Sequence, residues 1–126
     1  MKENIDRLIE ILKEQAQVFL LDAKEFYPFG TCINKENEIV PVSAYWENDN
    51  PPSQPLIDLL EKHFKQGIEN GDYKIAGIAI DGLQRENNFT YDIIEIRFFE
   101  TDKEVYKKYF KYEIKEHSVE FFENSL

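Results

Sequence analysis

The pattern of apolar and polar residues predicts a long first helix. Between Ile5 and Ala23, apolar residues recur at intervals of three and four, which places them along one side of a helix. Pro28 lacks an amide hydrogen and favours extended geometry at the residue before it, so this helix must end earlier. We therefore expect the chain to turn at the aromatic stretch EFYPFG, residues 25–30.

A second helix is predicted after the proline-rich polar loop at residues 47–55. Its apolar stripe runs through residues 57–68 at helical spacing. Ser53 has a side chain suited to the start of this helix, and Asn70-Gly71 fits a stop in left-handed backbone. The sequence thus contains two amphipathic helices, separated by a segment long enough for two strands.

The remaining apolar segments predict five strands, at residues 29–34, 39–46, 75–80, 90–99 and 105–115. Pro41 places the second strand at an edge or a bulge, because proline donates no ladder hydrogen bond. Residues 75–80 are apolar at every position, which is typical of a central strand covered on both faces. The tail, residues 118–126, fits either a short helix or one more strand.

The predicted order of elements is α-β-β-α-β-β-β, followed by the tail. We expect an α+β fold, with an antiparallel sheet of about five strands and two helices on one face, because this arrangement satisfies every apolar stripe. The order resembles that of profilin-like and roadblock-like domains, a likeness that carries no function by itself. A length of 126 residues predicts a single domain over residues 1–126.

The charge of the chain narrows the classes of partner. It has 25 acidic and 15 basic residues and a net charge of −10, which disfavours binding to nucleic acid or to an anionic membrane and favours a basic protein partner. Cys32 is the only cysteine, so no internal disulfide can form, and no apolar run is long enough to span a membrane. We expect a cytoplasmic protein.

No spacing in the sequence demands a particular chemistry. The phosphate-loop, dinucleotide, zinc-protease and calcium-loop patterns are all absent. Cys32 is predicted to be a small buried residue in a strand, His63 a residue at the boundary of the core, and His117 a loop residue. The sequence therefore predicts no catalytic residue, no metal site and no cofactor.

Alternation along the later strands predicts a partner surface. In the strand at residues 90–99, even-numbered apolar residues face one side and odd-numbered residues face the other. The odd side mixes tyrosine with apolar and charged residues, as protein interfaces do, and Glu95 and Arg97 are expected to form an ion pair there. The surface is predicted on the face opposite the helices and comprises Tyr45, Tyr91, Ile93, Glu95, Arg97, Phe99 and Tyr109. It would serve a protein partner or a homodimer, unless the tail covers it as a third layer.

The aromatic turn allows two interpretations. Phe26 and Phe29 would close the core between the first helix and the first strand, with Tyr27 at the rim. The alternative is a ligand pocket formed by Phe26, Tyr27, Phe29 and Trp46.

Four stretches resemble a group of small bacterial proteins without an assigned activity. They are EFYPFG at 25–30, PPSQ with LIDLL at 51–60, AGIAID at 76–81 and DIIEI at 92–96. The resemblance implies a single-domain protein and transfers no catalytic residue. This chain departs from the group at Ile93 and at Lys111-Tyr112, where the group has a small residue and a Pro-Tyr pair.

Two functional hypotheses follow from these observations. The first is a non-enzymatic interaction protein, with an immunity-type inhibitor of a basic toxin as one form of it. The alternative is a small-molecule-binding protein or minor enzyme that uses the aromatic pocket near Phe29 and Trp46.

Overall fold

The computed structural model describes residues 2–43 and 52–123 and confirms the predicted α+β class. The described elements are α1 (Lys2–Ala23), β1 (Phe29–Asn34), β2 (Ile39–Val42), α2 (Ser53–Glu69), β3 (Tyr73–Glu86), β4 (Phe89–Glu100), β5 (Tyr106–Ile114) and β6 (Val119–Glu123). The strands form one antiparallel six-stranded sheet in the order β2-β1-β3-β4-β5-β6. The sequence allowed either a helix or a strand for the tail. In the structure, the tail forms the sixth strand.

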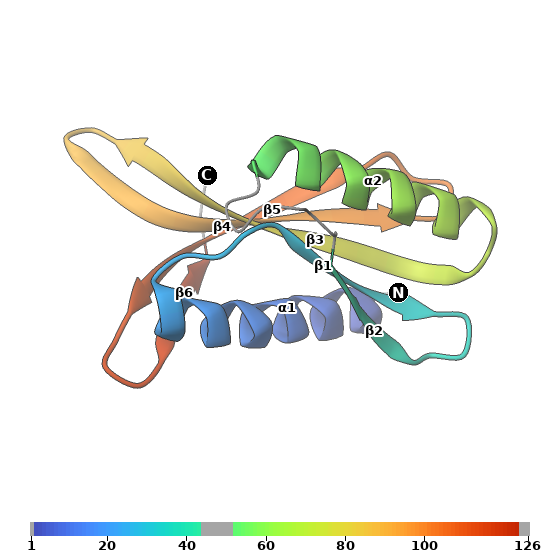
Figure 1. Cartoon of the computed structure of the whole chain (residues 1–126), viewed down its shortest axis with the longest axis horizontal. Helices are drawn as coiled ribbons and strands as arrows, with labels where there is room; N and C mark the ends of the chain where they lie inside the picture. Colours follow the sequence, from blue (N-terminus) through green and yellow to red (C-terminus); the bar gives the residue numbers. More distant parts are fainter. Residues whose placement is uncertain (1, 44–51, 124–126) are drawn as a thin grey trace.

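The two helices lie on opposite faces of the sheet, which corrects the expectation that they share one face (Figure 1). A methyl group added at Gly77 would meet Leu8 and Leu12 of α1, whereas one added at Gly30 would meet Phe64 of α2. The central strand β1 is buried at residues 29–33 and its neighbour β3 at residues 75–79, so both faces of this part of the sheet need a cover. α1 covers one of these faces, and α2 covers the other.

Two cores result from this three-layer arrangement. The core under α1 contains four fully buried helix residues, Leu8, Leu12, Ala16 and Leu20. The smaller core under α2 is formed by Cys32, Leu60, Phe64, Ala76, Ile78 and Phe99. Phe98 and Phe99 follow one another in β4 and enter opposite cores, which confirms the predicted alternation along this strand.

The helix ends follow local sequence. α1 ends at Ala23, and Lys24 adopts left-handed backbone with φ 66° before the aromatic turn. Gly71 after α2 has φ 80°, which confirms the predicted left-handed stop. α2 begins at Ser53, as the sequence predicted, and Pro52 occupies the N-cap position without a side-chain cap.

The outer strands and the β3–β4 hairpin complete the sheet. β2 is an edge strand, as Pro41 predicts, and β3 lies in the middle of the sheet with a helix on each face. β3 is longer than predicted: its pairing with β1 ends at Ala79, while its pairing with β4 continues to Glu86. The far end of this hairpin therefore projects beyond β1 (Figure 1).

Candidate functional site

The predicted partner surface occupies the sheet face opposite α1. Tyr109 pairs with Glu95, and Lys107 pairs with Arg97, so the side chains of these four residues lie on the same face. Tyr45 lies outside the described residues. The odd-numbered positions of β4 therefore share a face with the outward positions of β5, as the alternation predicted.

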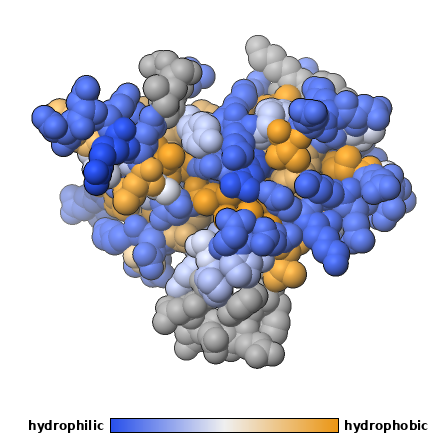
Figure 2. All heavy atoms as spheres, turned by 90° about the horizontal axis from the view of Figure 1, so that it is seen from above, coloured by the Kyte–Doolittle hydropathy of each residue, from blue (hydrophilic) through white to orange (hydrophobic). Residues whose placement is uncertain are grey.

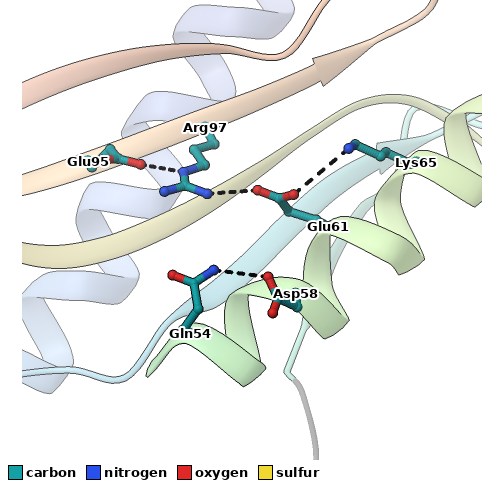
Figure 3. Close-up of polar contacts among 6 residues, drawn as sticks. All are labelled: Gln54, Asp58, Glu61, Lys65, Glu95 and Arg97. Atoms are coloured by element: carbon teal, nitrogen blue, oxygen red, sulfur yellow. Dashed lines mark hydrogen bonds and ion pairs between the residues drawn. The ribbon is translucent and has the colours of Figure 1, made fainter. Parts of the chain in front are cut away.

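α2 covers one end of this face, so the expectation of a surface free of both helices was wrong. Phe99 is only 3% exposed, and its ring lies 6.0 Å from that of Phe64 in α2. Arg97 donates a hydrogen bond from Nη1 to Glu61 of α2 at 2.7 Å, and its Nε donates to Glu95 (Figure 3). The ion pair predicted between Glu95 and Arg97 is confirmed, but it helps to hold α2 on the sheet.

The other end of the same face carries exposed aromatic residues, which we call the sheet patch. It comprises Phe89, Tyr91, Tyr109, Lys111 and Phe122. Phe89 is 63% exposed, and Tyr109 and Phe122 are each 38% exposed. Lys111 lies directly opposite Phe122, its Nζ is 4.1 Å from the centre of the Tyr91 ring, and it forms an ion pair with Glu86 at 2.6 Å. Viewed from the α2 side, the molecule shows hydrophobic residues exposed among hydrophilic ones (Figure 2).

Two aromatic members of the sheet patch, Phe89 and Phe122, were missed by sequence reasoning. Phe89 lies just before the predicted start of its strand, although the alternation that includes Tyr91 would have included it as well. The sequence could not assign Phe122 to a face of the sheet, because it did not decide whether the tail is a helix or a strand. Ile93, which was predicted to be part of the surface, is almost buried at 8% exposure and lies opposite Lys111 beneath the patch.

The aromatic turn lines a pocket of about 410 Å³. Phe26 and Phe29 are buried and contact each other edge to face at 5.5 Å, while Tyr27 is 43% exposed at the rim, as the core interpretation predicted. The pocket is completed by Phe19 of α1 and Leu56 of α2, which sequence reasoning did not select. Trp46 lies outside the described part of the chain.

A half-buried carboxylate lies behind the aromatic turn. Asp81 of β3 accepts hydrogen bonds from the Tyr112 hydroxyl at 2.6 Å and from the Phe26 backbone amide at 3.4 Å. Burial raises the pKa of Asp81, and the two hydrogen bonds oppose this effect in part. Burial and the bond to Asp81 also raise the pKa of Tyr112. This contact ties three separate elements together, and no local sequence signal indicates it.

The single thiol and the best-placed histidine take part in packing. Cys32 is fully buried under α2, and burial raises the pKa of its thiol to about 11. It is therefore protonated at neutral pH and a poor nucleophile. His63 Nε2 lies 2.7 Å from the Tyr73 hydroxyl at the edge of the same core, as expected for a boundary residue.

A second pocket, of about 570 Å³, lies between the end of α2 and the turn that follows β4. Its lining includes the apolar residues Ile68, Phe99 and Val105 and the basic residues Lys65 and Lys103. Sequence reasoning did not predict this pocket, because residues from α2 and from a turn about 35 positions later line it together.

Comparisons with protein-family models, with curated proteins and with solved structures found no match. Within residues 2–43 and 52–123, no group of three or more His, Cys, Asp or Glu side chains is arranged to hold a metal ion. None of the described helices is both long enough and apolar enough to cross a membrane. The functional argument therefore rests on the sheet patch and the pockets.

Proposed function

We propose that this chain is a non-enzymatic interaction protein that binds a basic protein partner through the sheet patch. The observation that carries the proposal is the group of aromatic side chains on β4, β5 and β6 that neither helix covers. Aromatic residues bury a large area at a low cost in conformational entropy and dominate the energetics of many interfaces. Exposed together on a rigid sheet, they offer a partner a pre-organised anchor.

The charge of the chain selects the kind of partner. A net charge of −10 attracts a cationic protein over a distance and repels a second copy of the same chain. The form of this function that we favour is an immunity-type inhibitor that covers a basic toxin. Such an inhibitor needs fast capture and no chemistry, which agrees with the buried, protonated state of Cys32.

The test compares substitutions inside and outside the sheet patch. Tyr109→Glu and Phe122→Glu place a charge within the patch, and Leu83→Glu places the same charge at a 70% exposed position on the opposite face of β3. Each tagged variant is expressed in the source cells, and co-purifying proteins are identified by mass spectrometry. We expect one basic protein to be retained by the wild type and by Leu83→Glu and to be lost with both patch variants.

Binding to the recovered partner should also weaken by roughly tenfold or more as salt is raised from about 50 to 500 mM, because screening removes the long-range attraction. A partner that Tyr109→Glu retains as well as the wild type does would contradict the proposal. Recovery of a stable metabolite without any protein would contradict it too.

The second candidate function is small-molecule binding in the pocket of the aromatic turn. The observation that favours it is a volume of about 410 Å³ with aromatic walls, within the range of about 300–1,000 Å³ of ligand sites. Native mass spectrometry of the purified protein would detect a bound molecule. The added mass should decrease in Phe19→Ala, which removes one wall, and persist in Val18→Ala, which alters its exposed neighbour on α1.

A further inference from the structure

The outer edge of β6 offers unpaired backbone groups. In the hairpin between β5 and β6, the Lys115 amide donates to the Ser118 carbonyl at 2.8 Å, and Ile114 opposite Val119 forms the next pair. Because hydrogen-bonded and non-bonded pairs alternate in an antiparallel ladder, the amide groups of Val119 and Phe121 point away from β5. They therefore face the open edge of the sheet.

A side chain from α1 already occupies one position along this edge. The Val119 amide donates to Oε1 of Gln17 at 3.0 Å. The Gln17 oxygen thus takes the place that the carbonyl of a neighbouring strand would fill. Two residues further along, the Phe121 amide has no partner within residues 2–43 and 52–123. At the opposite edge of the sheet, β2 carries Pro41, which has no amide hydrogen to offer.

The β6 edge borders a groove of about 360 Å³ between β6 and α1, which we call the edge groove. Glu10 and Glu14 line its α1 side, and both are exposed without an ion pair to any described residue. Lys13 lies between them in sequence, but its Nζ is 4.1 Å from the centre of the Phe110 ring. The same Nζ lies 5.6 Å from the centre of the Phe121 ring, so the α1 side of the groove carries the carboxylates of Glu10 and Glu14, while the Lys13 cation lies against the rings of the sheet.

We propose that the edge groove binds an extended, basic segment of another protein, which adds to β6 as a seventh strand. Main-chain hydrogen bonds to Phe121 and Val119 would hold the segment, with its carbonyl replacing the side chain of Gln17. Lysine or arginine side chains on the segment would pair with Glu10 and Glu14. The edge groove is separate from the sheet patch. A test of this proposal therefore does not decide whether the function proposed above is correct.

A second copy of the chain is a poor occupant for this edge. Two chains would each bring a net charge of −10, and each β6 would bring Glu120 and Glu123 to the contact. Like charges that meet across paired strands are destabilising. The acidity of the groove instead matches a cationic strand.

The probe is the peptide acetyl-Lys-Val-Lys-Val-Lys-amide, titrated into the ¹⁵N-labelled full chain and followed by NMR. We expect the largest amide shifts at Val119, Phe121, Glu10 and Glu14. The glutamate analogue acetyl-Glu-Val-Glu-Val-Glu-amide should bind far more weakly. A lysine peptide with N-methylated central amides should also bind weakly, because it cannot donate to the strand.

Three variants distinguish strand addition from general attraction. Glu10→Gln with Glu14→Gln should weaken binding about fivefold at low salt, whereas the charge-matched control Glu3→Gln with Asp22→Asn, at the ends of α1, should not. Gln17→Ala should tighten binding about threefold, because the peptide no longer displaces a side chain. Circular dichroism verifies that each variant is folded.

Several outcomes would overturn the proposal. They are equal binding of the lysine and glutamate peptides, equal binding of the N-methylated peptide, and shifts that fall on other elements. Weaker binding to a folded Gln17→Ala would also overturn it, as would dimerisation through β6 in the absence of peptide.

Discussion

At the scale of single residues, two glycines set how closely the helices approach the sheet. Gly77 leaves room for Leu8 and Leu12 of α1, and Gly30 leaves room for the ring of Phe64. A Cβ atom at Gly30 would lie 2.4 Å from that ring, which is fully buried and has no space into which to move. These glycines are required for their small size, since neither has the positive φ that favours glycine.

Gly30→Ala is therefore expected to destabilise the protein by about 2 kcal/mol, the usual cost of overpacking a core. Gly82→Ala is the matched control, because a Cβ atom there would meet Ile93 at an ordinary 3.6 Å. The control should change the free energy of unfolding by less than about 0.5 kcal/mol. Urea denaturation followed by circular dichroism measures both, and equal stabilities of the two variants would refute this account of α2 packing.

At the scale of elements, a polar bridge supplements the apolar contacts that hold α2 on the sheet. Glu61 lies on the side of α2 that faces β4 and accepts from Arg97, while Lys65 approaches Glu61 from the solvent side at 3.9 Å (Figure 3). Arg97 also bonds Glu95, so one guanidinium neutralises two carboxylates. Such a shared cation is worth more than an isolated surface pair.

Arg97→Met should accordingly cost about 1–2 kcal/mol, because it leaves Glu95 without a cation and leaves Glu61 with only the exposed Lys65. In a double-mutant cycle with Glu61→Gln, the coupling energy should be about 1 kcal/mol. Lys65→Met provides the control on the same helix, with an expected change below about 0.5 kcal/mol. A coupling energy near zero would show that the bridge does not help to position α2.

At the scale of the whole molecule, Asp81 connects the turn after α1 to β3 and β5. Its carboxylate bonds both the Phe26 amide and the Tyr112 hydroxyl, which lie 86 positions apart in the sequence. Because burial raises its pKa above 3.8, the folded chain keeps this proton to a higher pH than the unfolded chain does. The contribution of Asp81 to stability is therefore greatest when it is protonated and falls as the pH rises through the raised pKa.

Asp81→Asn should remove this decrease in stability just above pH 3.8 while keeping an acceptor for Tyr112. Tyr112→Phe should have the opposite effect and extend the decrease to higher pH, because the hydroxyl bond lowers the pKa of Asp81. Free energies of unfolding measured in urea across this pH range check both expectations. A wild type and an Asp81→Asn variant with parallel pH profiles would contradict the proposed role of Asp81.

Local sequence was sufficient to predict both helices and five of the six described strands, and the alternation of side chains along β4. Alternation along β4 assigned Phe98 and Phe99 to different sides, and the missing amide of Pro41 identified an edge strand. The pair of Glu95 and Arg97 could be predicted because residues two apart in a strand share a face. These features depend on short-range geometry, which a sequence specifies directly.

Only the tertiary structure decided which face of the sheet each helix covers. A strand that is apolar on both faces accepts a helix on either one, so the stripes of α1 and α2 are compatible with one face or with two. The choice of opposite faces buries Phe99 under α2 and leaves Tyr109 exposed and Tyr91 half-buried on the same face. Contacts such as Glu61 with Arg97 and Asp81 with Tyr112 join residues more than 30 positions apart, and the packing of whole elements brings these residues together.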